Sequence, residues 1–338
     1  MKYNTIQLAH GGGGWLSREL VRDEIVPRFG NSILNSLPDS ASLDIEGAGL
    51  IFTTDSYVVS PIEFPGGNIG NLAVHGTVND ISVSGGEPLF LSLALILEEG
   101  LDIAKLSRVL DAIKKSVDEC GVKIVTGDTK VVGSGQCDCI FINTSGIGRK
   151  IKGFQLGTDK IRDGDSIIVS GSIGDHGMAI IAARSNIGIT NGPVTDSAPV
   201  NRMVMALSAL APDISFMRDP TRGGLSAVLN ESIDGKALDV VISEKAIPFS
   251  QKSRAVAEML GVDLLQSACE GRFIIFCRQS IENAVLEILR GFENGKNVAC
   301  IGRVKATNST QGKVILDAAT GGRRVIDLPR GEMLPRIC

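Results

Sequence analysis

The chain has 338 residues, a formal net charge of −4, and 43% hydrophobic against 21% charged residues. This composition is that of a soluble folded protein and excludes intrinsic disorder as the main state, and the length predicts two domains. The acidic balance, without a Lys/Arg run, argues against nucleic acid as a partner. No apolar run approaches the roughly 20 residues of a membrane span. The N-terminus shows no secretory signal, so we expect a cytoplasmic protein.

The first half of the chain is expected to alternate strands and helices after a Gly-rich N-terminal segment, residues 1–40. Within that segment Gly11, Gly12, Gly13 and Gly14 form a run that we interpret as a mobile loop. Apolar runs predict a strand at 50–54, which ends at Asp55-Ser56 and resumes at 57–59, and further strands at 89–97, 122–126 and 141–144. Helical periodicity predicts helices at 69–80 and 102–120. The strand at 122–126 is expected to stop at Gly127-Asp128. Asp102 and Gly121 are residue types that begin and end a helix.

The composition changes near residue 150, which predicts a boundary between an N-terminal domain, 41–150, and a C-terminal α/β domain, 151–308. In the second domain we expect helices at 178–184, 199–210, 224–233, 250–260 and 280–290, and strands at 166–169, 238–242, 272–277 and 298–304. A C-terminal segment, 309–338, follows. Its last residues contain two prolines and a glycine, which predict an extended, mobile tail.

Four motifs place an acidic residue at a strand end or on a neighbouring helix, beside small, amide or basic residues. They are Thr54-Asp55-Ser56, Asn79-Asp80, Gly127-Asp128-Thr129-Lys130 and Asp219-Pro220-Thr221-Arg222. Carboxylates that converge at one edge of a sheet would hold Mg²⁺ together with substrate phosphates, and Lys130 and Arg222 would meet phosphate charge. Taken singly, each motif is also explained by strand termination and helix capping. The phosphate-binding P-loop and the protein-kinase motifs are absent from the sequence, so a nucleotide would bind in another way.

Two further residues are candidates for chemistry. Cys338 is the last residue and follows a Pro-containing tail, so its thiol is a candidate nucleophile; the alternative is an incidental cysteine. Glu270 precedes an apolar strand, where partial desolvation would raise its pKa and suit it to act as a general base. A salt bridge to Arg272 or an exposed turn is the alternative for Glu270. The histidines are too dispersed for a metal site, and each is expected to be structural; they are His10, His75 and His176.

Several motifs together resemble the HypE family, the carbamoyl dehydratases that help to make the cyanide ligands of nickel–iron hydrogenases. The resemblance covers essentially the whole chain. Its motifs are Pro335-Arg336-Ile337-Cys338 at the end, Phe64-Pro65-Gly66-Gly67-Asn68-Ile69-Gly70, Val125-Thr126-Gly127-Asp128-Thr129-Lys130 and Asp219-Pro220-Thr221-Arg222-Gly223-Gly224. The acidic motifs alone would place the chain only in the wider superfamily of aminoimidazole ribonucleotide synthetase and selenophosphate synthetase.

The resemblance implies an α+β fold of two α/β domains of the aminoimidazole ribonucleotide synthetase type. It further implies that the N-terminal sheet forms a barrel across a homodimer, and that ATP and Mg²⁺ are the cofactors. The implied Mg²⁺ ligands are Asp55, Asp80 and Asp128. The implied ATP contacts are Asn68, Asp80, Asp128, Thr129 and Lys130, with Gly11, Gly12, Gly13 and Gly14 as a mobile lid.

The implied activity is ATP-dependent dehydration of an S-carbamoyl group on Cys338 to a thiocyanate. The implied partners are the carbamoyltransferase HypF, which loads the thiol, and the HypC–HypD iron carrier, which receives cyanide. Glu270 would be the base, Lys130 would neutralise charge, and the orienting groups would be Asn143, Arg18 and Arg222. Two alternatives stay open: an ATP-dependent synthetase such as a selenophosphate synthetase, which would work without Cys338, and a non-catalytic carrier that does not use ATP.

Overall fold

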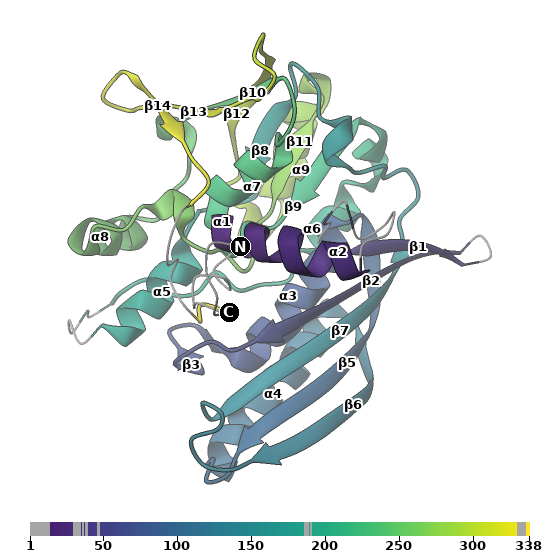
Figure 1. Cartoon of the computed structure of the whole chain (residues 1–338), viewed down its shortest axis with the longest axis vertical. Coiled ribbons are helices and arrows are strands. Elements are labelled where there is room, and N and C mark those ends of the chain that lie inside the picture. The colour runs from purple at the N-terminus through teal and green to yellow at the C-terminus, as the bar shows by residue number, and fades with distance from the viewer. Residues whose placement is uncertain are drawn as a thin grey trace.

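The computed structural model describes residues 14–29, 35, 37, 40–45, 48–185, 189, 191–329 and 336–338. Each half of the chain is built on one large sheet, and the two halves lie one above the other in Figure 1. Within the described ranges, no helix combines the length and the hydropathy needed to span a membrane.

The N-terminal half holds a five-stranded sheet in the order β1-β2-β7-β5-β6. Its strands are β1 (Ala41–Ile45), β2 (Ala48–Tyr57), β5 (Gly86–Glu98), β6 (Lys123–Val132) and β7 (Ile140–Lys150), and a hairpin of β3 (Glu63–Phe64) and β4 (Gly67–Asn68) follows β2. Neighbouring strands are antiparallel except for the parallel pair β5 and β6. Helices α3 (Ile69–Val83) and α4 (Ile103–Cys120) pack on one face, behind the sheet in Figure 1.

The ends of these two helices follow from local chemistry. Asp102 accepts a hydrogen bond from the Lys105 backbone N–H at 3.1 Å, and Gly121 ends α4 with a left-handed φ of 74°. Asn68 caps α3 by accepting from the backbone N–H of Gly70 at 2.8 Å. Both predicted helices are therefore confirmed, as are the predicted caps of α4.

The C-terminal half holds a seven-stranded sheet in the order β14-β13-β10-β12-β8-β11-β9. Its strands are β8 (Ser166–Val169), β9 (Ile214–Arg218), β10 (Leu238–Ser243), β11 (Ile274–Cys277), β12 (Ala299–Ala306), β13 (Val314–Asp317) and β14 (Arg323–Ile326). Its helices are α5 (Asp175–Arg184), α6 (Asn201–Ala206), α7 (Gly224–Ser232), α8 (Gln251–Leu260) and α9 (Glu282–Arg290). Helix α7 packs on one face of the sheet, and α6 and α9 pack on the other.

The structure corrects several predicted elements. The strand expected to stop at Gly127-Asp128 continues through both residues as β6. A Cβ on Gly127 would lie 2.3 Å from the Leu93 carbonyl oxygen, so this glycine permits the close parallel pairing with β5 rather than ending the strand. The helix expected at 199–210 ends at Ala206 and gives way to a 3₁₀ segment, Ser208–Asp213. Further helices and strands were not predicted: α1 (Trp15–Leu20), α2 (Val26–Phe29), β1, β3, β4, β9, β13 and β14.

The N-terminal sheet is open, because β1 and β6 are its two edges and do not pair in the described chain. A barrel is therefore not closed within one chain. The tail expected at the C-terminus falls partly on residues 330–335, which lie outside the described residues, and the structure places only its last three residues.

Candidate active site

Two of the predicted carboxylates lie between the N-terminal sheet and α3. Alternate residues of β2 face this helix, as shown by Tyr57, whose hydroxyl lies 3.4 Å from that of Thr77 on α3. Asp55 shares that face, and Thr53 on the same face donates a hydrogen bond to Asp80 at 3.0 Å. Burial raises the pKa of Asp55 although Arg222 opposes the shift. Burial raises the pKa of Tyr57, and the negative charges of Asp55 and Asp80 raise it further.

The third predicted carboxylate lies on the opposite face of the sheet. Asp128 and Asn143 both pair with Ala94 across neighbouring strands, and Asn143 pairs with Ser56. Laterally paired residues point to the same face, and Ser56 points away from the face that carries Asp55. Asp128 instead forms an exposed ion pair of 2.6 Å with Lys130. The three acids therefore do not converge in one chain, and the described residues contain no cluster of three metal-ligating side chains.

The other predicted ligand contacts on this domain have structural partners. Asn143 donates to the Asp55 carbonyl oxygen and to the Ser56 hydroxyl, both at 2.9 Å, which fastens β7 to β2. Asn68 uses its side chain to cap α3 and to donate to the Arg108 carbonyl oxygen at 3.4 Å. Thr129 lies beside Asp128 on the exposed strand β6. Their roles toward ATP stay predictions.

Helix α1, near the N-terminus, contacts two segments of the C-terminal half of the chain. Arg18 on α1 forms a 2.5 Å ion pair with Asp234 in the C-terminal half. The backbone N–H of Trp15 donates to the Pro329 carbonyl oxygen at 3.2 Å. A Cβ on Gly14 would lie 2.6 Å from that same oxygen, so Gly14 packs against the segment that leads to the tail. Gly11, Gly12 and Gly13 of the predicted lid lie outside the described residues.

Glu270 is the most deeply buried acid of the site. Its side chain is 2% exposed, and its Oε1 has no hydrogen-bond partner among the described residues. Burial raises the pKa of Glu270 well above its ordinary value of 4.5, and Asp219, Asp55 and Asp196 raise it further. Arg272 pairs with Asp196 at 3.7 Å, and no ion pair joins it to Glu270 among the described residues, so the alternative of a Glu270–Arg272 salt bridge is wrong. The predicted desolvation of Glu270 is confirmed.

Asn79 on α3 connects Glu270 to the N-terminal domain. Its amide nitrogen donates to the backbone carbonyl oxygens of Glu270 and Ala198, both at 3.1 Å. Its side-chain oxygen accepts from the Val200 backbone N–H at 2.9 Å. Asp196 accepts from the Glu270 backbone N–H at 3.0 Å. The position of Glu270 is thus set by elements of both halves of the chain.

Arg222 and Cys338 lie within the electrostatic reach of the same carboxylates. Arg222 is exposed, and Cys338 is the largest cause of its raised pKa, with Asp55 and Glu270 adding to the shift. Cys338 is partly buried; removal from water raises the pKa of its thiol, Glu270 raises it further, and Arg222 opposes the shift. The structure therefore brings together Asp55, Arg222, Glu270 and Cys338, which the sequence had placed in four distant segments.

The last three residues of the chain contact a set of residues that we call the tail seat: Val58, Ser60, Asp138, Phe141, His176 and Arg184. The backbone N–H groups of Val58 and Ser60 donate to the backbone oxygens of Cys338 and Arg336 at 3.1 and 3.3 Å. The His176 Nε2 donates to the Ile337 carbonyl oxygen at 2.7 Å. In Figure 1 the C-terminus accordingly lies between α5 and β3.

Sequence reasoning missed the residues that receive the tail. His176 was expected to be structural, and Arg184 was not considered, because neither stands in one of the four acidic motifs. His176 is buried beside Phe64, with ring centroids 5.6 Å apart, and burial lowers its pKa to about 4. The signal that could have found it is the Gly171-x-x-Gly174-x-x-Gly177 turn, which leads the chain into α5.

The burial of Glu270 leads to a prediction about stability. Because the folded protein raises the pKa of Glu270, stability is full below about pH 4.5 and falls as the pH rises toward the raised value. We therefore expect Glu270→Gln to raise the melting temperature at pH 7 and to lose that advantage near pH 4.5. Thermal unfolding at both pH values, with exposed Glu258→Gln as the control, measures the difference. Equal melting temperatures at pH 7 would contradict the burial of a charged carboxylate.

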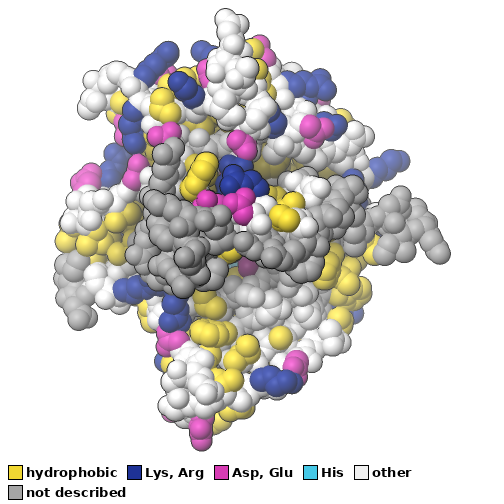
Figure 2. All heavy atoms as spheres, in the orientation of Figure 1, with side chains coloured by type: hydrophobic (Ala, Val, Ile, Leu, Met, Phe, Trp, Pro, Cys, Tyr) yellow, Lys and Arg dark blue, Asp and Glu magenta, His cyan; other side chains and the backbone are white. Residues whose placement is uncertain are grey.

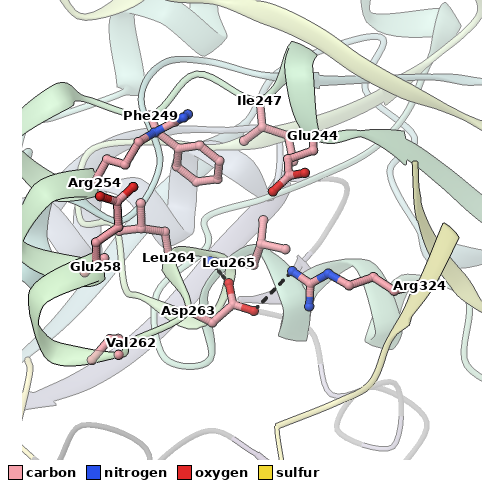
Figure 3. Close-up of a pocket in the computed structure, with 12 residues that line it drawn as sticks. Glu244, Ile247, Phe249, Arg254, Glu258, Val262, Asp263, Leu264, Leu265 and Arg324 are labelled. Atoms are coloured by element: carbon pink, nitrogen blue, oxygen red, sulfur yellow. Dashed lines mark hydrogen bonds and ion pairs between the residues drawn. The ribbon is translucent and has the colours of Figure 1, made fainter. Parts of the chain in front are cut away.

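A separate pocket of about 320 Å³ lies in the C-terminal half, between α8, the 3₁₀ segments and β14 (Figure 3). Phe249, Leu264 and Leu265 form part of its apolar lining, and Arg324 reaches Asp263 across it at 3.4 Å. None of the predicted site residues lines this pocket. The candidate chemistry therefore lies around Glu270 and Cys338.

Two family models match the chain. The AIR synthase related protein, N-terminal domain, matches residues 38–150, and the AIR synthase related protein, C-terminal domain, matches residues 162–315. Both matches follow the division into two sheets.

Curated relatives match the chain over its whole length. A carbamoyl dehydratase HypE of Rhodobacter capsulatus is 42% identical over 340 residues, which cover 100% of this chain and 99% of the relative. The carbamoyl dehydratase HypE of Escherichia coli is 40% identical over 99% of this chain and 100% of its own length.

Solved structures show the same likeness. A crystal structure of the hydrogenase maturation protein HypE in complex with ATP matches with a TM-score of 0.82 and 43% identity, over 99% of this chain and 100% of that one. A HypE–HypF complex matches with a TM-score of 0.86 and 38% identity, over 92% of this chain and 99% of that one.

Proposed function

The chain belongs to the carbamoyl dehydratase HypE family, and from that premise we propose that it converts an S-carbamoyl group on Cys338 into a thiocyanate with consumption of ATP. The observation that carries the proposal is the seating of Cys338 within electrostatic reach of Glu270, Arg222 and Asp55. A carrier that only exposed its tail thiol would not need a buried carboxyl group at that position. The fate of the carbamoyl group on Cys338 when ATP is added is the test.

The reaction balances as one carbamoyl thioester plus ATP giving one thiocyanate, ADP, phosphate and a proton. The amide oxygen leaves as part of phosphate, which is a far better leaving group than oxide. Both N–H protons of the carbamoyl group must be removed. Glu270 is suited to accept them, because its pKa is raised above that of an exposed glutamate, which makes its carboxylate a stronger base. Arg222 supplies fixed positive charge beside the reacting thioester.

Asp55 and Asp80, which lie between the sheet and α3, fit a magnesium ion only together with a nucleotide. Mg²⁺ usually takes one or two protein carboxylates and completes its shell with water and phosphate oxygens. Asp55 and Asp80 would hold it here, and because burial raises the pKa of Asp55, a bound cation would stabilise its carboxylate form. When bound, Mg²⁺ would neutralise phosphate charge.

We further propose that the chain works as a homodimer through the outer face of the N-terminal sheet, which is the face that α3 and α4 do not cover. Phe52, Ile147 and Phe90 pair across β2, β7 and β5 as one lateral row, and they are 41%, 41% and 42% exposed. Figure 2 shows hydrophobic side chains over this sheet in the lower part of the view. Strand β6 adds an exposed edge, which proteins normally cover. A second sheet on this face would form the expected barrel, and it would cover the Asp128–Lys130 pair, whose ATP contacts we therefore assign to the assembled dimer.

The homodimer leads to a prediction. Phe90 lies in this exposed lateral row on β5 and is 42% exposed, so Phe90→Glu would place a charge at the interface without disturbing the core. We expect the variant to shift from dimer to monomer, measured by sedimentation at micromolar concentration. The matched control is Ile103→Glu. Ile103 is 75% exposed and lies on α4, the helix that packs on the other face of the sheet, away from the proposed interface. A dimer that survives Phe90→Glu, or a monomer in the unchanged protein, would contradict the proposed interface.

The partners are proposed by the same premise. A relative has been solved in complex with HypF, and we propose that HypF carbamoylates Cys338 in this chain. We propose the HypC–HypD iron carrier as the acceptor of cyanide, because a thiocyanate needs a recipient to regenerate the thiol. Delivery to both partners requires the tail to leave the tail seat. A cytoplasmic location stays a prediction.

A further inference from the structure

The contacts in the tail seat are those of a bound peptide. Two backbone N–H groups of residues 58 and 60 meet the backbone oxygens of residues 338 and 336, which is the pairing of an added antiparallel strand. The Arg336 Nε returns a bond to the Val58 carbonyl oxygen at 2.8 Å, and Arg184 donates to the Arg336 carbonyl oxygen. The carbonyl oxygens of Arg336 and Ile337 and one terminal oxygen of Cys338 each accept a hydrogen bond from a donor elsewhere in the chain.

His176 can serve this role only in one protonation state. Its Nε2 must carry the proton, because it faces the Ile337 carbonyl oxygen at 2.7 Å. Its Nδ1 then accepts from the Thr195 hydroxyl at 2.7 Å. Burial lowers the pKa of His176 to about 4, so the neutral ring is the form present near pH 7. The ring is thus a fixed donor for the carbonyl that precedes the reactive cysteine.

The side chains of the tail are recognised as well. Ile337 is 4% exposed and belongs to the hydrophobic core cluster of the N-terminal domain. Arg336 forms a 2.5 Å ion pair with Asp138, and its guanidinium lies 5.7 Å from the centre of the Phe141 ring. Ile337 is therefore held by apolar packing, and Arg336 is held by an ion pair and an aromatic ring. Cys338 carries the thiol.

We propose that the tail seat is a peptide-binding site that accepts a separate peptide ending in Arg-Ile-Cys, and that the enzyme dehydrates an S-carbamoyl peptide supplied in trans. The inference rests on the proposed function and extends its substrate class from the chain's own tail to such peptides. All the contacts above are made by the last three residues, so recognition does not require the covalent connection. The connection raises the local concentration of the tail, on the order of millimolar for a short flexible linker, and a free peptide must reach a comparable concentration.

The chemistry is that of the reaction in cis. The C–O bond of the peptide's carbamoyl group breaks, its oxygen passes to phosphate, and its nitrogen forms the triple bond of the thiocyanate. ATP gives ADP, one of the two N–H protons ends on phosphate, and the other is released. No oxidant or reductant is needed.

The experiment uses the full-length variant Ile337→Asp, Cys338→Ser, whose own tail has lost both its apolar anchor and its thiol. The probe is a synthetic S-carbamoyl peptide, Leu-Pro-Arg-Ile-Cys, added with ATP and Mg²⁺, and the product is identified by mass spectrometry. We expect saturable formation of the peptide thiocyanate. The control peptide with Asp in place of Ile should react at least about tenfold more slowly, because a charged side chain cannot enter the apolar pocket.

A parallel reaction of the unchanged protein, carbamoylated on Cys338, separates the two claims. If this reaction succeeds and the peptide stays intact at millimolar concentration, the peptide-binding inference is overturned and the proposed function stands. If the tail is not dehydrated either, the proposed function itself fails. Should the double variant not bind ATP, Cys338→Ser replaces it. Its seated tail should compete, so turnover that saturates only at higher peptide concentration supports the inference, and no turnover overturns it.

Discussion

Replacing Cys338 by serine is expected to abolish thiocyanate formation completely. Serine keeps the backbone oxygen that accepts from Val58, and the contacts of Arg336 and Ile337 are unchanged, so the tail should still occupy the tail seat. The hydroxyl is a far weaker nucleophile than a thiol at neutral pH, so it would not take up the carbamoyl group. Incubation with the carbamoylating partner and ATP, followed by mass analysis of the C-terminal peptide, measures the loss.

The matched control for this variant is Cys300→Ser. Cys300 is also partly buried, but it lies on β12 in the C-terminal sheet, and none of the described contacts joins it to the tail. We expect this control to retain dehydration. Residual thiocyanate chemistry in Cys338→Ser would show that the product is built on another group, as a synthetase acting on a free small substrate would allow.

Glu270→Gln is expected to lower the rate of dehydration by about 10²- to 10⁴-fold, the usual contribution of a general base. The amide matches the carboxyl group in shape, and the backbone contacts of Glu270 with Asn79 and Asp196 stay in place. The loss should fall on the rate of the chemical step rather than on ATP binding. Single-turnover kinetics of the carbamoylated protein, beside an ATP titration, separates the two.

The pH profile supplies a second readout for the same residue. A base must be deprotonated, so the single-turnover rate of the unchanged protein should rise with pH toward an apparent pKa well above 4.5. This rise should vanish in Glu270→Gln and persist in the exposed control Glu258→Gln. A Glu270→Gln variant that dehydrates the tail at the unchanged rate would show that another group removes the N–H protons.

Helix α4 shows what the sequence could predict of the fold. Its apolar residues recur at helical spacing, and Asp102 and Gly121 mark its ends, so local information was sufficient. Strand β6 shows the limit: Gly127-Asp128 is typical of a turn, yet the residues continue the strand because β5 runs parallel beside them. That pairing depends on a partner 34 positions away in register, such as Ala94 with Asp128, which no local pattern contains.

The candidate site divides in the same way. Burial of Glu270 followed from its position before an apolar strand and was predicted. The convergence of Asp55, Asp80 and Asp128 was not met in one chain, because side chains alternate between the two faces of a sheet and the register decides which face each occupies. The tail seat could not be predicted, since it depends on His176 and Arg184 reaching a segment more than 150 positions later in the chain.

The central claim is that Cys338 carries the group on which ATP acts. The most direct measurement is the mass of the C-terminal peptide of the unchanged protein, first after carbamoylation by the partner and then after addition of ATP and Mg²⁺. The account predicts that the carbamoylated peptide loses the mass of one water, with one phosphate released for each thiocyanate formed. Persistence of the carbamoyl group on Cys338 while ATP and Mg²⁺ are present would contradict it.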